Sequence, residues 1–142
     1  MTNQAVTPIS TTESWELIQK EPRVIFIDVR SEMEFLFIGH PTGAVNIPWI
    51  EEPDWEINPN FVRDTRRLML GGVIDGSEHN AVPILLICRS GKRSEEAGNL
   101  LIEKNFKRVY NIEQGFEGDL NDKHQRSAIG GWRFDGLPWE QC

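Results

Sequence analysis

The sequence predicts an α/β fold in which helices cover both faces of a mainly parallel central sheet. Two short, wholly apolar runs, 24–27 and 84–87, are typical of strands that are buried on both faces. Weaker strand patterns lie at 44–47 and 108–110, and helical patterns lie between the strands. This alternation of strands and helices indicates a parallel sheet with helices packed against it.

Each of the three expected helices begins at a recognisable cap. Residues 10–13 read Ser-Thr-Thr-Glu, a capping box that begins the first helix. Asn58-Pro59 is expected to begin the second helix, because asparagine caps well and proline suits the first turn, and Gly71-Gly72 is expected to close it. Ser94 is expected to cap the third helix, which ends near Asn105.

Length and composition predict one globular domain. The chain has 142 residues, enough to bury a core, and we expect a single domain over 1–142 with its core at about 8–118. Hydrophobic residues make up 39% and charged residues 26%, which is ordinary for a globular protein and excludes a disordered or fibrous chain.

Two stretches do not follow the alternating pattern. The polar, glycine-rich stretch from Gly71 to Val82 is predicted to be a surface loop. The segment 119–142 carries Trp132 and Trp139 among several glycines, and we predict a C-terminal strap of irregular structure whose tryptophans dock on the domain.

Charge and hydropathy exclude several classes of partner. The net charge of −7 is opposite to that of a typical nucleic-acid-binding protein. The longest apolar run, 84–88, is far too short to span a membrane, and the N-terminal residues show no secretory signal. Two cysteines make no disulfide framework. We therefore expect a cytoplasmic protein that binds neither nucleic acid nor membrane.

The segment around Cys88 carries the chemical signal. A cysteine ends a buried strand, a short loop with a glycine follows, and a helix begins directly afterwards. This order places the sulfur at the carboxyl edge of the sheet and directs loop amides and the positive end of the helix toward it. Three of the six residues from Cys88 to Arg93 are basic and none is acidic. We expect these features to lower the pKa of the thiol and to make Cys88 a nucleophile.

A cysteine at a strand end is more often simply a small core residue. The basic loop after Cys88 favours the nucleophile, because core positions are seldom followed by two adjacent cations around a turn of small residues. Such a composition suits a loop that holds an anion.

Four segments, in order along the chain, carry a resemblance to a known family. They are Ile27–Arg30 with Glu34, Gly39–Pro48, Cys88–Ser94 and Gln114–Phe116. Together they resemble the single-domain rhodanese family of sulfurtransferases, in which Cys88–Ser94 matches the six-residue active-site loop. The ending 131–139 is similar to that of a bacterial subgroup. The resemblance implies a five-stranded parallel sheet flanked by helices.

The resemblance also implies a two-stage transfer of sulfur. Cys88 takes a sulfane sulfur from a small anionic donor such as thiosulfate, becomes a persulfide, and passes the outer sulfur to a thiol or to cyanide. Arg89 and Lys92 attract the donor, whereas Arg93 braces the loop. The residues implied to bind the donor and the persulfide, through loop amides and cations, are Arg89, Ser90, Gly91, Lys92, Arg93 and Ser94.

Two alternatives compete with this enzyme. A rhodanese-like domain can also act as a sulfur carrier or as a regulatory binding module without appreciable turnover, although the intact Cys88 loop favours an active transferase. The related tyrosine-phosphatase-type loop requires an arginine after five intervening residues. Ser94 stands at that place and Arg93 comes one residue early, which disfavours a phosphatase or an arsenate reductase.

We expect the remaining polar residues either to support the site or to take no part in it. Asp28 and Arg30 are expected to form an ion pair or hydrogen bond that supports the catalytic loop or the Glu34 segment. His40 is expected to satisfy backbone groups. The three histidines lack the spacing of metal ligands, so neither a metal nor another cofactor is expected. Cys142, the final residue, is expected to be an exposed thiol, with a resolving thiol as the alternative.

Overall fold

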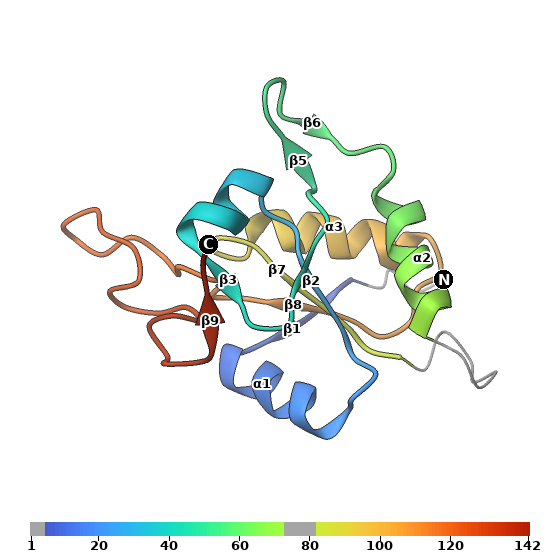
Figure 1. Ribbon diagram of the computed structural model, residues 1–142, viewed down its shortest axis with the longest axis horizontal. Helices are drawn as coiled ribbons and strands as arrows, with labels where there is room; N and C mark the ends of the chain where they lie inside the picture. The colour runs from blue at the N-terminus through green and yellow to red at the C-terminus, as the bar shows by residue number, and fades with distance from the viewer. Residues whose placement is uncertain (1–4, 73–81) are drawn as a thin grey trace.

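The computed structural model describes residues 5–72 and 82–142. A central five-stranded sheet has the order β1-β8-β7-β2-β4, and all of its pairings are parallel (Figure 1). Its strands are β1 (Thr7–Ile9), β8 (Val109–Ile112), β7 (Ile84–Ile87), β2 (Ile25–Asp28) and β4 (Val45–Asn46). The predicted parallel sheet is therefore confirmed.

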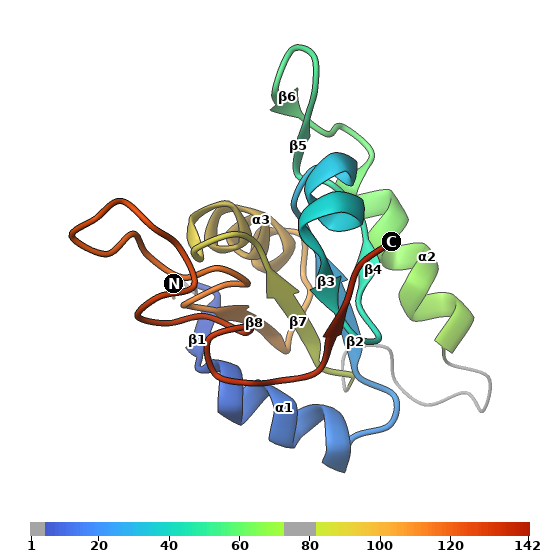
Figure 2. The same cartoon turned by 60° about the vertical axis from the view of Figure 1, so that its left-hand side comes forward.

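Helices cover both faces of this sheet, as Figure 2 shows. Helix α1 (Thr11–Lys20) lies on one face, and helices α2 (Phe61–Gly72) and α3 (Lys92–Glu103) lie on the other. Successive side chains of a strand point to opposite faces, so Leu85 packs in the cluster beneath α1 while Leu86 packs in the cluster beneath α2 and α3. Among the described residues, no helix combines the length and the apolarity needed to cross a membrane.

The sequence pattern does not predict the edge strand β1. It is only three residues long and contains Pro8, which lacks a backbone donor. Proline is tolerated on an edge strand because one side of that strand makes no ladder hydrogen bonds. β1 pairs with β8 on its inner side, and this register is a product of tertiary packing.

The helix beginnings follow the predictions in one case out of three. At α1, Ser10 Oγ accepts the Glu13 N–H and the Glu13 carboxylate accepts the Ser10 N–H, which confirms the capping box. Helix α2 begins at Phe61 and not at Pro59, because Asn58 Oδ1 accepts the Asn60 N–H and forms a separate turn before the helix. The predicted second helix is otherwise present.

The predicted cap at Ser94 is wrong. Helix α3 begins two residues earlier, at Lys92, and its N-cap is Gly91 in the left-handed region, with no side-chain cap. Ser94 is fully buried inside the first turn of the helix. Its hydroxyl makes hydrogen bonds elsewhere in the site.

Short elements fill the space between the main strands. They are the π-helix η1 (Glu34–Ile38), the strand pair β3 (His40–Pro41) with β9 (Trp139–Glu140), and the hairpin β5 (Ile50–Glu51) with β6 (Glu56–Ile57). The hairpin projects from the body of the molecule in both cartoon views (Figures 1 and 2). Of the predicted loop from Gly71 to Val82, residues 73–81 lie outside the described residues.

The C-terminal segment 119–142 contacts the domain through both of its tryptophans. Trp132 is fully buried, packs edge-on against Trp15, and lies 5.3 Å from Phe26 between ring centroids. Trp139 remains 40% exposed and packs edge-on against Phe116. This segment is not wholly irregular, because β9 adds a short antiparallel pairing with β3.

Candidate active site

Cys88 lies directly after β7, at the carboxyl edge of the central sheet. The chain turns through residues 89–91 and then enters α3. The cysteine is only 1% exposed and belongs to the apolar cluster beneath α2 and α3. Burial alone would make it a core residue, so the polar contacts of its sulfur decide what the site can do.

Three donors from the start of α3 point at the Cys88 sulfur. The Gly91 N–H lies 3.1 Å from Sγ, the Ser94 N–H lies 3.4 Å away, and the Ser94 hydroxyl lies 3.2 Å away. All three stand at the positive end of the helix dipole. Donors in this arrangement can stabilise negative charge that develops on the sulfur during a reaction.

Gly91 is required by the geometry of this loop. Its φ is +103°, in the region where a β-carbon is strongly disfavoured. A β-carbon built there would lie 2.1 Å from the backbone oxygen of Glu113. Only glycine lets the loop pass this close to the end of β8 and keep its N–H directed at the sulfur.

The turn after β8 holds the loop from the other side. The N–H of Phe116 donates to the Cys88 carbonyl at 2.8 Å, and the N–H groups of Glu117 and Gly118 donate to the Arg89 carbonyl at 2.9 and 3.1 Å. A β-carbon at Gly115 would lie 2.5 Å from that same Arg89 oxygen. The turn over Gly115–Gly118, which overlaps the end of the Gln114–Phe116 motif, thus forms a backbone clamp on the first two loop residues.

Arg93 forms a two-pronged ion pair with Glu34 of η1. Its two terminal nitrogens lie 2.7 and 3.0 Å from the carboxylate oxygens. Burial raises the pKa of Glu34, but the hydrogen bonds and charge of Arg93 and a backbone hydrogen bond from Ser31 outweigh it and lower that pKa from 4.5 to about 2. Burial lowers the pKa of Arg93, whereas the hydrogen bond and charge of Glu34, followed by the charges of Cys88 and Asp28, raise it above its ordinary value. The guanidinium therefore ties the loop to η1.

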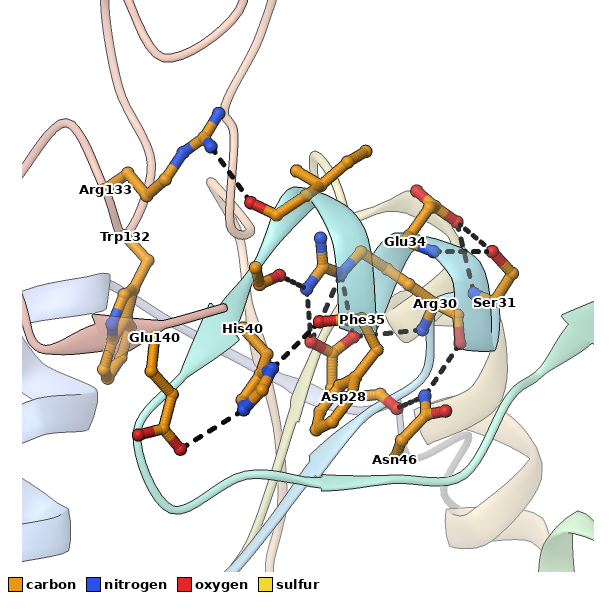
Figure 3. A network of polar contacts seen from close by, with 12 residues as sticks. Asp28, Arg30, Ser31, Glu34, Phe35, His40, Asn46, Trp132, Arg133 and Glu140 are labelled. Atoms are coloured by element: carbon orange, nitrogen blue, oxygen red, sulfur yellow. Dashed lines mark hydrogen bonds and ion pairs between the residues drawn. The ribbon is translucent and has the colours of Figure 1, made fainter. Parts of the chain in front are cut away.

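Asp28 and Arg30 form a second, fully buried ion pair (Figure 3). Arg30 Nη2 donates to Asp28 Oδ2 at 2.7 Å and to the carbonyl of Gly39 at 2.5 Å. Its guanidinium also lies 4.5 Å from the centroid of the Phe116 ring, a cation–π contact. These contacts join the end of β2 to the backbone before β3 and to the turn that clamps the Cys88 loop.

Arg89 and Lys92 are the exposed cations of the loop. Within 5–72 and 82–142, neither side chain takes part in an ion pair. Ser90, between them, is half-buried. The two cations are therefore available to an anion that approaches the loop from solvent.

Comparison with known proteins places the chain in a family. The model of the rhodanese-like domain matches residues 10–122. The chain belongs to the rhodanese family. This match includes the Cys88 loop, the Glu34 segment and the turn at Gly115.

Three relatives show how far the likeness extends. The solved structure of the Mycobacterium tuberculosis protein Rv0390 is 32% identical, covers 98% of this rhodanese chain and 100% of its own, and superposes with a TM-score of 0.81. The uncharacterized Rickettsia prowazekii protein RP600 is 30% identical over 93% of this chain and 95% of its own length. The thiosulfate sulfurtransferase GlpE of Actinobacillus pleuropneumoniae is 25% identical, with 97% and 96% covered.

Sequence reasoning missed Asn111 as a residue of this rhodanese site. Asn111 is a polar residue in the middle of the apolar strand β8 and is only 5% exposed. Its side chain contacts both Ser94 and the backbone of Gly91. A buried asparagine within an otherwise apolar strand was the available signal, because such a group requires hydrogen-bond partners.

The other polar residues singled out in the sequence lie away from the sulfur's donors. His40 stacks on the Phe35 ring and its Nδ1 lies 2.9 Å from the Phe35 carbonyl, so it contacts the backbone as expected (Figure 3). Cys142 is exposed, and its N–H donates to the Leu36 carbonyl. Among the described residues, no group of three or more His, Cys, Asp or Glu side chains is placed to hold a metal ion.

A hollow of about 520 Å³ lies beside the rhodanese loop. It is lined by Pro8, Ser90, Gly91, Lys92, Glu95, Asn111 and Glu113. Its walls therefore combine the loop backbone with one cation and two carboxylates. Cys88 itself is not part of the lining.

Proposed function

We propose that this rhodanese is a sulfurtransferase in which Cys88 carries sulfane sulfur as a persulfide. The observation that supports it most is the convergence of two amides and one hydroxyl on Sγ, at the positive end of α3. Hydrogen-bond donors fixed in advance around a reacting sulfur stabilise the charge that develops on it. The GlpE relative is itself named a thiosulfate sulfurtransferase.

The first step loads sulfur from an anionic donor such as thiosulfate. The Cys88 thiolate attacks the outer sulfur of the donor, a new S–S bond forms, and sulfite leaves with the electron pair of the broken bond. Arg89 and Lys92 stand at the outer side of the loop and attract the donor through their charge. Arg93 is already paired with Glu34, so its role is to hold the loop in place.

The second step passes the outer sulfur to an acceptor. A thiolate or cyanide attacks that sulfur, the S–S bond to Cys88 breaks, and Cys88 returns as the thiolate. The product is a persulfide when the acceptor is a thiol and thiocyanate when it is cyanide. In each step one nucleophile displaces another at a sulfur atom, so neither a metal nor a redox cofactor is required.

The burial of Cys88 also fits a simple core residue. A cysteine that only fills space needs no polar partners, since its thiol is a weak donor and a weak acceptor. Here Gly91 adopts a left-handed conformation that favours glycine, and the buried Ser94 hydroxyl lies between the sulfur and Asn111. Two backbone amides and this hydroxyl all lie within hydrogen-bond distance of the sulfur, an arrangement that a space-filling cysteine does not require.

Mass spectrometry of the intact protein tests the loading step. Incubation with thiosulfate is expected to add the mass of one sulfur atom to the wild type and to Cys142→Ser, but not to Cys88→Ser. Cys142→Ser is the matched control, because it removes the other cysteine of the chain, whose thiol is exposed. Loading that survives in Cys88→Ser and disappears in Cys142→Ser would refute the proposal.

Turnover separates an enzyme from a carrier. If the protein is a transferase, cyanide or a small thiol will release the sulfur from loaded Cys88 and sulfite will accumulate over many cycles. A persulfide that forms once and does not pass to either acceptor would instead identify a sulfur carrier dedicated to another protein.

A further inference from the structure

Asn111 contacts both residues that donate hydrogen bonds to the Cys88 sulfur. Its side-chain nitrogen Nδ2 donates to the Gly91 carbonyl at 3.1 Å. Its side-chain oxygen Oδ1 accepts from the Ser94 hydroxyl at 2.5 Å, and that same hydroxyl lies 3.2 Å from Cys88 Sγ. Asn111 itself makes no hydrogen bond to the sulfur among the described residues. Its contacts instead influence the hydrogen bonds that Gly91 and Ser94 make to the sulfur.

The Ser94 hydroxyl has two acceptors and a single hydrogen. Because the Asn111 nitrogen is occupied by the Gly91 carbonyl, the atom that faces Ser94 is the amide oxygen, which can only accept. The amide oxygen can only accept, whereas a neutral thiol can donate its S–H, so the hydroxyl hydrogen lies toward Asn111 while Cys88 is a neutral thiol. In that state the Ser94 oxygen can accept the S–H of Cys88.

Ionisation of Cys88 reverses this preference. A thiolate has no hydrogen to donate and acts only as an acceptor. Ser94 can donate to it only by turning its hydrogen away from Asn111, which leaves a buried amide oxygen without its partner. The two acceptors therefore compete for one hydrogen, and the competition is stronger the more charge the sulfur carries.

We propose that Asn111 is a positioning residue that controls the ionisation of Cys88 through the Ser94 hydroxyl. Asn111 disfavours the thiolate form of Cys88 because its amide oxygen retains the hydrogen of the Ser94 hydroxyl. The backbone amides of Gly91 and Ser94 favour the thiolate wherever that hydrogen points. This inference deepens the proposed function and rests on it for its biological consequence, because sulfur uptake starts from the thiolate.

Other charged groups stand on the elements next to this sulfur. They are Arg93, Lys92, Glu95 and Glu96 of α3, Arg89 of the loop, Glu34 of η1, Asp28 and Arg30 at the end of β2, and Glu113 after β8. None of them changes when Asn111 or Ser94 is replaced. Their contributions therefore cancel when the two substitutions are compared singly and together in a double-mutant cycle.

Four proteins test the proposal, all in a Cys142→Ser background so that one thiol titrates. The first carries no further change, the second carries Asn111→Leu, the third carries Ser94→Ala, and the fourth carries both substitutions. The readout is the ultraviolet absorbance of the thiolate as a function of pH, which requires no reagent to reach the buried sulfur. Leucine has the branched shape of asparagine and removes both the acceptor for Ser94 and the donor to the Gly91 carbonyl.

Asn111→Leu is expected to move the midpoint of Cys88 ionisation down by about half to one pH unit, the equivalent of one hydrogen bond. In the Ser94→Ala background the same substitution is expected to leave the midpoint in place. An equal shift in both backgrounds would show that Asn111 acts through packing or through Gly91, and would overturn the proposal. In the protein that retains Ser94, an upward shift of the Cys88 midpoint on Asn111→Leu, or no shift, would also overturn the proposal.

A second variant covers the case in which Asn111→Leu does not fold. Asn111→Asp keeps the size and the acceptor oxygen and adds a charge, so the midpoint is expected to move up, and further with Ser94 present than with Ser94→Ala. Equal upward shifts would overturn the proposal. The titration contains no sulfur donor, so a Cys88 that never takes up sulfur would refute the proposed function without altering this result.

Discussion

The ion pair between Glu34 and Arg93 makes the stability of the protein depend on pH in a predictable direction. Folding lowers the pKa of Glu34 from 4.5 to about 2. An ionised carboxylate that is favoured by folding stabilises the folded state above its ordinary pKa, and this stabilisation is lost as the pH falls toward the lowered value. Glu34 therefore stabilises the protein at neutral pH and ceases to do so in acid.

The size of the effect follows from the same pKa change. A lowering from 4.5 to about 2 corresponds to roughly 3 kcal/mol in the free energy of unfolding. The two side chains are 17% and 18% exposed, so solvent screens part of this interaction. Glu34→Gln also retains an acceptor for Arg93, and we expect it to lower the free energy of unfolding by about 1–2 kcal/mol at pH 7.

Denaturant unfolding of both proteins at pH 7, and at about pH 5, 4 and 3.5, measures this directly. The difference between wild type and Glu34→Gln is expected to be largest at pH 7 and to shrink below about pH 4.5, because the unfolded wild type then takes up a proton at Glu34 while the folded protein does not. Glu32→Gln is the matched control, because Glu32 is an exposed carboxylate on the same segment. A difference that is absent at pH 7, or that stays constant down to about pH 3.5, would refute the reasoning.

Two further substitutions test the backbone of the loop and the C-terminal segment. Gly91→Ala combines a left-handed φ with a β-carbon 2.1 Å from the Glu113 carbonyl, so it is expected to lower the free energy of unfolding by roughly 3 kcal/mol or more and to abolish sulfur loading. Gly136→Ala has a similar φ in open space and is expected to cost only about 1–2 kcal/mol with loading intact; equal losses would contradict this account. Trp132→Phe removes a fully buried indole and is expected to cost about 2–3 kcal/mol in denaturant unfolding, against less than about 0.5 for Trp55→Phe at a half-exposed position. Similar stabilities for these two variants would show that Trp132 of the C-terminal segment does not contribute to the hydrophobic core.

The features that could be predicted from the sequence depend on neighbouring residues. The apolar runs at β2 and β7 mark strands buried on both faces, and the Ser10–Glu13 capping box forms within a single turn. The order of strand, cysteine, glycine loop and helix likewise fixes Cys88 at the edge of the sheet. In each case the sequence signal lies in residues only a few positions apart.

The start of α3 shows where local reasoning ends. Ser94 has the side chain of a good N-cap, and local preference alone would place it there. The tertiary structure begins the helix at Lys92 because Gly91 fits closely against Glu113, and it brings Asn111 to the Ser94 hydroxyl as a stronger partner. A capping preference of about 1 kcal/mol is outweighed by the contacts that β8 and the turn after it make with this segment.

By itself, the sequence predicted the candidate residues for chemistry and determined the edge of the sheet at which Cys88 lies. Only the tertiary structure decided what holds them: Glu34 reaches Arg93 across 59 positions, and Asn111 reaches Ser94 across 17. A hydrogen bond or an ion pair is formed by whichever compatible group packing brings within about 3 Å, and many residues of the chain are chemically compatible. The choice among them follows from the parallel order β8-β7-β2 and the packing of α3 against it.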